Sequence, residues 1–453
     1  MDHPIEHATI TILGAGYVGL TTGALLASAG LTVYIVEPNT ERRQAIAAGR
    51  SFFYEAGLDP LVARTVAAGT LIPTDSYADS VPRSHFVISC VGTPDNPDGS
   101  SNLSYIFAAA ESALPHLQPG SIYVQKSTVP VGTGAQIEQL FSKQKAAVSY
   151  VSNPEFLREG TALADTLYFD RVVAGGQDLA AVERVLQLYQ HLEIFRDDIA
   201  SRASLDRPPH TGRYIATSLS SAELIKVTAN AFLALKISFA NSIALLADTV
   251  DADIVDVMDA VGADARIGRS FLNAGRGYGG GCFPKDVSGL IASAHEHGID
   301  IDIMTAAQAM NDHMPHYIID KLTRALQAPL DHSTIAVLGL AFKGGTSDAR
   351  RSPGVAIANL LQAAGATVTA YDPEAIHEAA PHLHDSIRLD TSIEYALTGA
   401  DAVIIATEWP EFITMSPATY APAMRGTVLV DAVNQLDKAA VQAAGLRYIG
   451  VGR

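Results

Sequence analysis

One of the chain's two cysteines, Cys282, lies in the segment GYGGGCFPKD (277–286). A cysteine reacts as its thiolate, and a nearby cation such as Lys285 favours that form. The glycines remove side chains that would shield the sulfur, and they let a substrate come close to the backbone. A structural cysteine at a tight turn is the alternative, but the glycines and the Lys285-Asp286 pair favour a nucleophile.

Two polar residues interrupt the apolar segment AELIKVTANAF (222–232). Lys226 and Asn230 are four residues apart, so a helix places them on one face. A lysine that faces inward loses hydration and becomes usable as a base or as a partner for an oxyanion. A lysine that extends along a solvated edge is the alternative, and the helix alone does not decide between the two.

Two carboxylates occur four residues apart in the segment SNPEFLREGTAL (152–163). A carboxylate of Glu155 or Glu159 could position a water molecule for hydrolysis. A surface ion pair with the adjacent Arg158 is the alternative. Taken singly, neither this segment nor the helix decides a function.

The amino-terminal segment predicts an element that would hold a redox cofactor. A strand over 9–13 runs into GAGYVG (14–19), a helix follows as far as Gly30, and a second strand ends at Glu37. A GxGxxG motif between strand and helix, with an acid about 20 residues on, is typical of a dinucleotide-binding turn. Glu37 would accept both ribose hydroxyls and repel a 2′-phosphate, which predicts NAD, although Arg42 could accommodate such a phosphate. A structural turn is the alternative.

Further strands are predicted at 85–94 and 121–132. Ligands of an open parallel sheet bind beyond the carboxyl ends of its strands, which places Thr93 and the group 126–128 near the cofactor. Cys90 lies inside an apolar run, so we expect a buried small side chain there.

The rest of the chain predicts a helical middle and a second nucleotide-binding-type fold. From about 215 to 320 the pattern is helical, with Ser220 and Glu223 spaced as a capping box. The segment GATVTAYDPE (365–374) repeats the pattern of GLTVYIVEPN (30–39), but the second copy lacks the second and third glycines, so a second dinucleotide is not expected. We therefore predict an α/β protein with two Rossmann-like doubly wound domains joined by a central helical domain, bounded at 1–212, 213–325 and 326–453.

The composition restricts the class of protein. A net charge of −17 argues against binding to nucleic acid or to an anionic membrane. Two cysteines form no disulfide framework, and we found neither a signal peptide nor an apolar run long enough to span a bilayer. A cytoplasmic enzyme is expected, with no metal site.

The three polar groups and the predicted fold combine into one reaction. A dehydrogenase with a reactive cysteine can oxidise an alcohol to an aldehyde, add the thiolate, oxidise the thiohemiacetal to a thioester and hydrolyse it. That chemistry needs a nucleophile, a cation or amide near the oxyanion, and a carboxylate to position water. All three are present in the sequence.

The chain closely resembles the nucleotide-sugar 6-dehydrogenases of the UDP-glucose/GDP-mannose dehydrogenase family. The resemblance runs over nearly the whole length, through GAGYVG, STVPVGT, NPEFLREG, AELIKVTANAFLALKISF, FLNAGRGYGGGCFPKD and LGLAFKGGTSDARRSPG. It implies the oxidation of UDP-glucose to UDP-glucuronate by NAD, with Cys282 as thioester nucleophile. It also implies that Lys226, Asn230 and Asp286 stabilise the oxyanion and position the water. Thr128 and Glu155 would assist proton transfer or hydrolysis.

The same resemblance implies the binding residues. The cofactor contacts are Gly14, Gly16, Val18, Gly19, Glu37, Arg42, Thr93, Thr128, Glu159, Lys285 and Arg350. The UDP-sugar contacts are Glu155, Phe156, Leu157, Arg158, Glu159, Lys226, Asn230, Arg266, Phe271, Leu272, Asn273, Ala274, Gly275, Gly279 and Lys343. Arg266 would come from a neighbouring subunit, across a dimer or larger homo-oligomer built on the central helix.

One departure from the family pattern affects the sugar preference. Val433 stands in the segment DAVN (431–434), where family members commonly carry an arginine that approaches the substrate. A long polar segment at 196–214 has no assigned function. The alternative substrates are GDP-mannose and a UDP-N-acetylhexosamine. Two alternatives from other classes remain, a two-electron NAD dehydrogenase with a structural cysteine and a non-catalytic nucleotide-sugar sensor.

Overall fold

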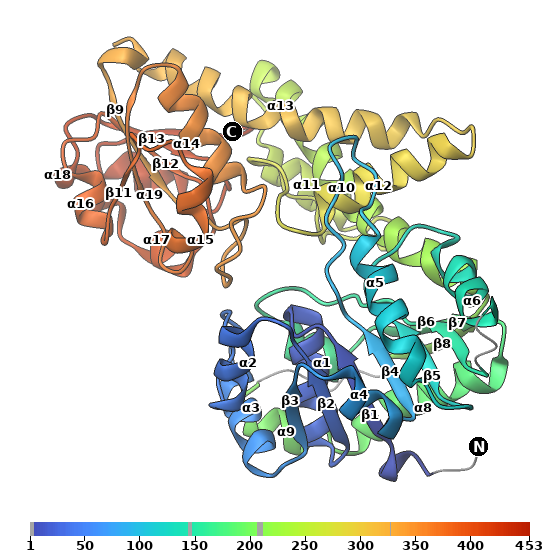
Figure 1. The fold of residues 1–453 in the computed structure, drawn as a ribbon. Coiled ribbons are helices and arrows are strands. Elements are labelled where there is room, and N and C mark those ends of the chain that lie inside the picture. Colours follow the sequence, from blue (N-terminus) through green and yellow to red (C-terminus); the bar gives the residue numbers. More distant parts are fainter. Residues whose placement is uncertain (1–3, 144–146, 206–211, 327) are drawn as a thin grey trace. The chain divides into compact units, whose positions relative to one another are not determined.

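The computed structural model describes residues 4–143, 147–205, 212–326 and 328–453. Part of the polar segment at 196–214, residues 206–211, lies outside the described residues. The chain divides into two compact units, Met1–Ala229 and Asn230–Arg453 (Figure 1). The division into three domains at 212 and 325 stays a prediction.

The first unit is built on an eight-stranded sheet. Its order is β3 (Leu71–Thr74), β2 (Thr32–Val36), β1 (Thr9–Leu13), β4 (Phe86–Ser89), β5 (Ile122–Gln125), β6 (Ser149–Ser152), β7 (Arg171–Gly176) and β8 (Arg213–Thr217). Neighbouring strands are parallel except β6 and β7. The strand order reverses between β1 and β4, and this switch point is where open α/β sheets bind ligands.

Helices cover both faces of this sheet. Phe86 and Ile88 of β4 belong to one apolar cluster, and Val87 between them belongs to another, so alternate residues face opposite layers. The helices are α1 (Tyr17–Ser28), α2 (Thr40–Ala47), α3 (Leu58–Ala67), α4 (Tyr77–Ser80), α5 (Ser104–Ala113), α6 (Thr133–Lys143), α7 (Ala162–Leu167), α8 (Leu179–Ile194) and α9 (Arg196–Arg202).

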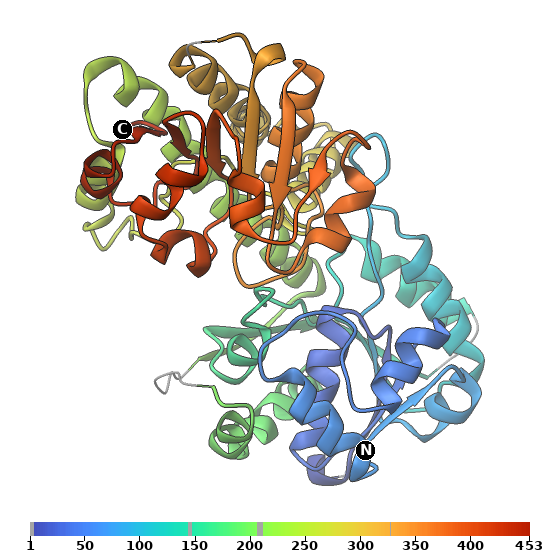
Figure 2. The same cartoon turned by 90° about the vertical axis from the view of Figure 1, so that its left-hand side faces the viewer.

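The second unit contains a six-stranded, all-parallel sheet of the same order as the first six strands of unit one. The order is β11 (Arg388–Leu389), β10 (Thr367–Tyr371), β9 (Thr334–Leu338), β12 (Ala402–Ile405), β13 (Val428–Asp431) and β14 (Arg447–Gly450). Figure 2 shows helices on both sides of these strands. They are α14 (Pro353–Ala363), α15 (Ile376–Ala379), α16 (Ile393–Leu397), α17 (Pro410–Thr414), α18 (Pro417–Ala423) and α19 (Lys438–Ala443).

Between the sheets the chain forms α10 (Leu219–Val250), α11 (Ile254–Gly262), α12 (Phe283–Glu296) and α13 (Asp302–Ala325). The predicted α/β architecture, two Rossmann-like sheets joined by helices, is confirmed. The predicted capping box of Ser220 and Glu223 is wrong. Glu223 turns away from the start of α10 to accept hydrogen bonds from Gly132 N and Gly134 N, while Ser218 Oγ accepts from Ser221 N.

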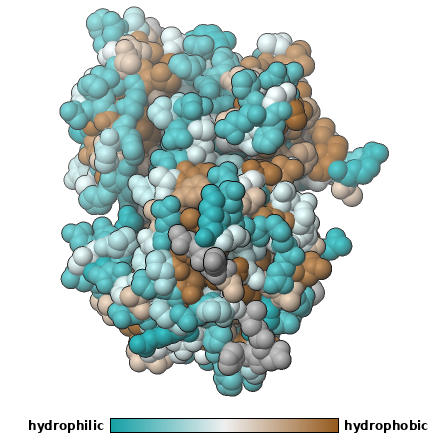
Figure 3. Space-filling view, turned by 45° about the vertical axis from the view of Figure 1, so that its right-hand side comes forward, coloured by the Kyte–Doolittle hydropathy of each residue, from teal (hydrophilic) through white to brown (hydrophobic). Residues whose placement is uncertain are grey.

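The helix α10 also corrects a second expectation. By length and composition it is apolar enough to cross a membrane. The sequence analysis predicts no apolar run long enough to span a bilayer, and this helix departs from that expectation. The core helix of a protein that does not enter a membrane passes the same test. Polar residues cover much of the face in Figure 3, with small apolar groups between them.

The second sheet repeats the glycine turn of the first more closely than the sequence indicated. In unit one, a Cβ on Gly19 would lie 2.0 Å from Gly14 O. In unit two, a Cβ on Gly354 would lie 2.2 Å from Gly339 O, so Gly354 takes the place of the third glycine. A long insertion, 340–353, separates Gly339 from Gly354, so the spacing in the sequence did not indicate that Gly354 corresponds to Gly19. The expectation that the third glycine is missing is therefore wrong.

Candidate functional site

The glycine turn of unit one has the shape that a dinucleotide requires. Gly14 ends β1 with a left-handed φ of 92°, and Gly19 lets α1 pack against it. Gly16 caps α1, and a Cβ there would meet nothing within 4 Å. The start of α1 is therefore open beside Gly16, which leaves room for a pyrophosphate at the helix N-terminus.

The different surroundings of two glycines give a testable pair of variants. Gly16→Ala should keep the melting temperature near that of the wild type and weaken NAD binding, because the new methyl group enters open space beside the turn. Gly19→Ala should destabilise unit one by about 1–3 kcal/mol or more, because its methyl group overlaps Gly14 O. Calorimetric melting and NAD titration measure both effects. Equal melting temperatures for the two variants would contradict this account of the turn.

Glu37 directly follows β2, one residue after the strand ends at Val36, where the strand was predicted to end at Glu37. It is buried, and its carboxylate accepts from Ala15 N at 3.2 Å and Asn39 N at 2.9 Å, which orients it towards the turn. Arg42 is exposed, and its guanidinium lies 4.8 Å from the Phe52 ring centroid. The residues present thus fit NAD, with an acid fixed beside the turn.

The loops after β4 and β5 lie at the predicted edge of the sheet. Thr93 and Thr128 are half-buried there, and Glu223 fixes the second loop through Gly132 and Gly134. Lys126, expected near the cofactor, is instead buried, and its ammonium donates to Tyr189 Oη at 2.7 Å.

Lys226 forms a buried ion pair with Glu155, 2.9 Å from Nζ to Oε1. Both side chains are almost fully buried, at 3% and 7% exposure, which excludes a lysine on a solvated edge. The second carboxylate oxygen of Glu155 accepts from Leu157 N, and the Lys226 ammonium lies 5.4 Å from the Phe156 ring centroid. The pair is thus held rigidly at the end of β6.

Arg158 does not pair with Glu155. Its guanidinium makes two hydrogen bonds to Asp165, of 2.9 and 2.6 Å, and its own N–H donates to the same carboxylate. The ion pair of Arg158 and Asp165 stabilises the loop before α7. Glu159, half-buried, follows in the same loop.

In unit two, Cys282 is the N-cap residue of α12. The positive end of the helix dipole stabilises an anion at that position, such as a thiolate. Cys90 differs, since burial raises the pKa of its thiol to about 12 and it stays protonated at neutral pH. Sequence reasoning placed Cys282 in a turn and missed the helix start, although Pro284 at the second position of the helix was a usable signal.

Asp286, one turn into α12, is buried and accepts two hydrogen bonds. Asn230 Nδ2 donates to Oδ2 at 2.6 Å, and the Lys285 ammonium lies 2.7 Å from Oδ1. The carboxylate, amide and ammonium therefore form one cluster beside Cys282. Lys285 forms an ion pair with Asp286. The N-terminus of α12 is therefore a second source of positive potential at the sulfur.

The glycines before Cys282 serve a different purpose from the one expected. A Cβ on Gly277 would lie 2.5 Å from Asn311 Oδ1, one on Gly279 would lie 2.4 Å from Arg351 O, and one on Gly281 would lie 2.5 Å from the Arg350 guanidinium. The segment thus packs tightly against α13 and the insertion 340–353, and the glycines do not simply clear space for a substrate.

The segment proposed for the UDP-sugar packs on the DAVN turn. Asn434 donates to Ala274 O, and Ala432 O accepts from Arg276 N. Val433 is nearly buried, with its Cα 3.5 Å from a Cβ built on Gly275. The turn therefore supports 271–275 through its backbone and Asn434, without an arginine.

The remaining predicted residues occupy varied environments. Phe271 has a left-handed φ of 67°, a strained conformation for an aromatic residue. Leu272 is buried and Asn273 is exposed. Lys343 Nζ lies 5.7 Å from the Phe342 ring centroid, and Arg350 bonds to Asp348 at 2.7 Å. The Arg266 side chain is 88% exposed and pairs with Asp264.

Sequence reasoning missed three residues that position the site. Asn311 Oδ1 accepts from Tyr278 N at 2.7 Å, and its amide donates to Tyr278 O. Arg276 is buried and donates to Phe342 O at 2.6 Å. Glu55 accepts from Gly160 N at 2.7 Å. None carried a local motif, because each acts on a segment distant in the sequence.

The Rossmann sheet, the glycine turn and Glu37 define an NAD-dependent dehydrogenase. Models of the NAD binding domain, the central domain and the UDP binding domain of the UDP-glucose/GDP-mannose dehydrogenase family match residues 8–193, 220–313 and 336–438. The chain belongs to this family. The predicted family, enzyme class and NAD cofactor are confirmed.

Known proteins resemble the chain over nearly its full length. A UDP-glucose 6-dehydrogenase of Rhizobium meliloti is 40% identical, with 98% of this chain and 99% of that protein covered. UDP-glucose 6-dehydrogenase TuaD of Bacillus subtilis is 38% identical, with 98% of this chain and 93% of that protein covered. The structure of a UDP-glucose dehydrogenase from Pyrobaculum islandicum superposes with a TM-score of 0.88 at 35% identity. The match covers 100% of this chain and 99% of that structure.

Proposed function

We propose that the protein oxidises UDP-glucose to UDP-glucuronate in two NAD-dependent steps joined by a covalent adduct on Cys282. The observation that carries the mechanism is a cysteine at the start of α12, beside an Asp286 carboxylate held by Asn230 and Lys285. The choice of sugar is supported by the similarity to UDP-glucose 6-dehydrogenases.

The chemistry balances with the residues of this chain. NAD, when bound, supplies a hydride acceptor for each oxidation. The C6 hydroxyl loses its proton, assisted by Thr128 or Glu155, as C6 becomes an aldehyde. The Cys282 thiolate then forms a bond to C6, and Lys226 and Asn230 stabilise the resulting oxyanion.

Loss of a second hydride from C6 converts the thiohemiacetal into a thioester. Water, positioned by Asp286 or Glu155, attacks the thioester carbon, the C–S bond breaks, and the thiolate leaves. The product is a carboxylate and two NADH are formed. A two-electron dehydrogenase with a structural cysteine would release an aldehyde and one NADH.

The test is a substrate panel with purified protein and NAD. We expect turnover with UDP-glucose and much less with UDP-galactose, UDP-N-acetylglucosamine and GDP-mannose, with two NADH formed per UDP-glucuronate. Preference for GDP-mannose would overturn the choice of sugar. One NADH per product would overturn the covalent mechanism, and binding of a nucleotide sugar with no NADH would indicate a sensor.

We also propose a cytoplasmic homo-oligomer that pairs through α10. Its exposed apolar residues Phe232, Phe239, Leu246 and Val250 follow a spacing of seven or four residues, which gathers them on one side of the helix. An exposed apolar stripe of this kind indicates an interaction face. Lys236 donates to Ile267 O and Gly268 O, which fastens the loop of Arg266 to α10 and supports a role for Arg266 in the partner's site.

A charged residue in this stripe should separate the subunits. Phe239→Glu should weaken self-association by about 30-fold or more, because it places a charge at the centre of the interface. Tyr395→Glu is the matched control, since Tyr395 is an exposed aromatic residue on α16. Light scattering with size-exclusion chromatography measures the mass. A Phe239→Glu variant with the mass of the wild-type oligomer would exclude this face.

A further inference from the structure

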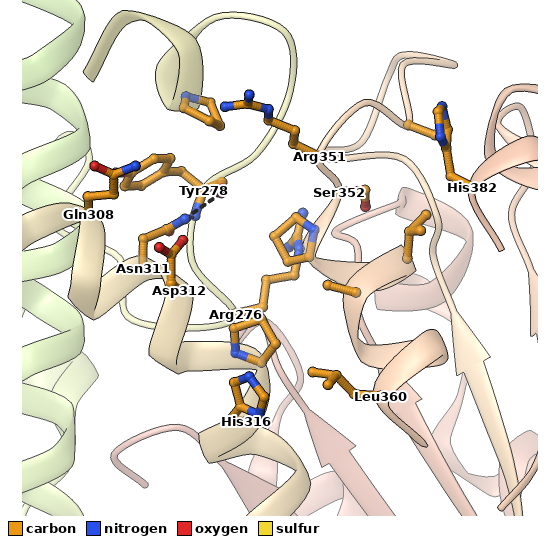
Figure 4. Close-up of a pocket in the computed structure, with 16 residues that line it drawn as sticks. Arg276, Tyr278, Gln308, Asn311, Asp312, His316, Arg351, Ser352, Leu360 and His382 are labelled. Atoms are coloured by element: carbon orange, nitrogen blue, oxygen red, sulfur yellow. Dashed lines mark hydrogen bonds between the residues drawn. The ribbon is translucent and has the colours of Figure 1, made fainter. Parts of the chain in front are cut away.

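Unit two contains a cavity of about 530 Å³ between α13 and α14, behind the glycine segment (Figure 4). Tyr278 and Pro284 of that segment form part of its wall, whereas Cys282 and Asp286 are not among its lining residues. The cavity is therefore distinct from the cluster around Cys282, although the two share one stretch of backbone.

The charged groups of the cavity favour an anion. Two arginines line it, Arg276 and Arg351, against the single lining carboxylate of Asp312, and the rings of His316 and His382 add further hydrogen-bonding groups. Ser352 and Pro353, at the N-terminus of the 11-residue helix α14, also line it, so the positive end of the helix dipole lies at its wall. Partial burial raises the pKa of Asp312.

A buried donor of the cavity has unused capacity. Arg276 is only 6% exposed, and Figure 4 shows its side chain between those of α13 and Ser352. Two of its nitrogens bond to Glu408 and Phe342 O, but among the described residues its Nε has no hydrogen-bond partner. A buried guanidinium nitrogen without a partner is costly. An anion that turned the Arg276 side chain towards the cavity would pair this nitrogen and relieve that cost.

Two contacts connect the cavity with the proposed site. Asn311, in the cavity wall, holds both backbone polar groups of Tyr278, four residues before Cys282. Arg276 donates to Phe342 O, next to Lys343. A ligand that moved either side chain would displace a segment proposed to carry the nucleophile or the UDP-sugar.

We propose that this cavity binds a small anionic sugar derivative and that its binding changes turnover at Cys282. The phosphate or carboxylate would lie on Arg276, Arg351 and the start of α14. The hydroxyl groups would bond to Gln308 and Asp312. The effect on turnover rests on the proposed function, whereas the binding itself does not.

Calorimetric titration of the full chain with glucose 1-phosphate and with glucuronate tests the binding, with glucose as the neutral control. UDP-glucose is present in excess without NAD, so that the substrate site is filled. We expect one or both anions to bind and glucose not to bind. Arg351→Asn should weaken the binding about tenfold or more, because it removes a charge-assisted hydrogen bond. Asparagine tolerates the left-handed φ of 47° at this position.

Arg388→Asn is the matched control, because Arg388 is an exposed arginine of unit two that does not line the cavity, and it should leave the affinity unchanged. Binding of glucose 1-phosphate alone would identify the anion as a phosphate. Absence of binding, or affinity that Arg351→Asn leaves intact, would overturn the site.

In steady-state kinetics the anion should change kcat at an unchanged KM for UDP-glucose, and competition with UDP-glucose would overturn the regulatory effect. Inactivity towards UDP-glucose would overturn only the proposed function.

Discussion

Cys282→Ser should abolish steady NADH production while UDP-glucose and NAD still bind. Serine is close to cysteine in volume and can cap α12 equally well, so the fold should be kept. Its hydroxyl is a far weaker nucleophile than a thiolate, and its ester is hydrolysed more slowly than a thioester. We expect kcat to fall on the order of 10³-fold or more. Stopped-flow absorbance, with ligand titration of the same variant, measures both quantities.

The adduct itself provides an independent readout. Wild-type protein quenched during turnover should carry the mass of the UDP-sugar, joined through C6, on the peptide that contains Cys282. Cys90→Ser is the matched control, because the Cys90 thiol is buried and protonated at neutral pH. That variant should keep two NADH per product. Four-electron turnover by Cys282→Ser at the wild-type rate would show that another group is the nucleophile.

The parts of the fold that the sequence predicted correctly depend on local patterns. The turn at 14–19 and Glu37 lie within one strand-helix-strand unit, so their spacing alone indicated their geometry. The repeated pattern at 365–374 likewise indicated a second sheet of the same kind. Hydrophobic periodicity and glycine spacing carry this information because the contacts are formed by near neighbours in the chain.

The parts that the sequence did not predict depend on distant contacts. Glu223 matched a capping box, but its carboxylate bonds to a loop about 90 residues earlier. The glycines before Cys282 looked like room for a substrate, whereas Gly277 is required by Asn311 on α13. Gly354 takes the place of a motif glycine across an insertion. No window of sequence contains both partners of such contacts, so only the folded chain reveals them.

Lys226→Met should lower kcat by about 10²–10³-fold, because it removes a positioned cation from the developing oxyanion. The affinity for UDP-glucose should change much less, since the charge it would stabilise exists only during the reaction. Single-turnover kinetics and ligand titration measure the two effects. The variant also leaves Glu155 without its buried partner, and an unpaired buried charge costs about 3–5 kcal/mol of stability. The rate could therefore fall because unit one unfolds.

A double variant separates catalysis from stability. Lys226→Met combined with Glu155→Gln removes both charges of the 2.9 Å pair, so no unpaired buried charge is left. We expect its melting temperature to return towards that of the wild type, while kcat stays as low as in Lys226→Met or lower. Glu155→Gln alone should keep the oxyanion partner and lose the carboxylate that assists proton transfer or hydrolysis. Recovery of activity together with stability in the double variant would show that Lys226 acts only through the fold. Loss of activity in a stable double variant would assign the pair to the chemistry itself.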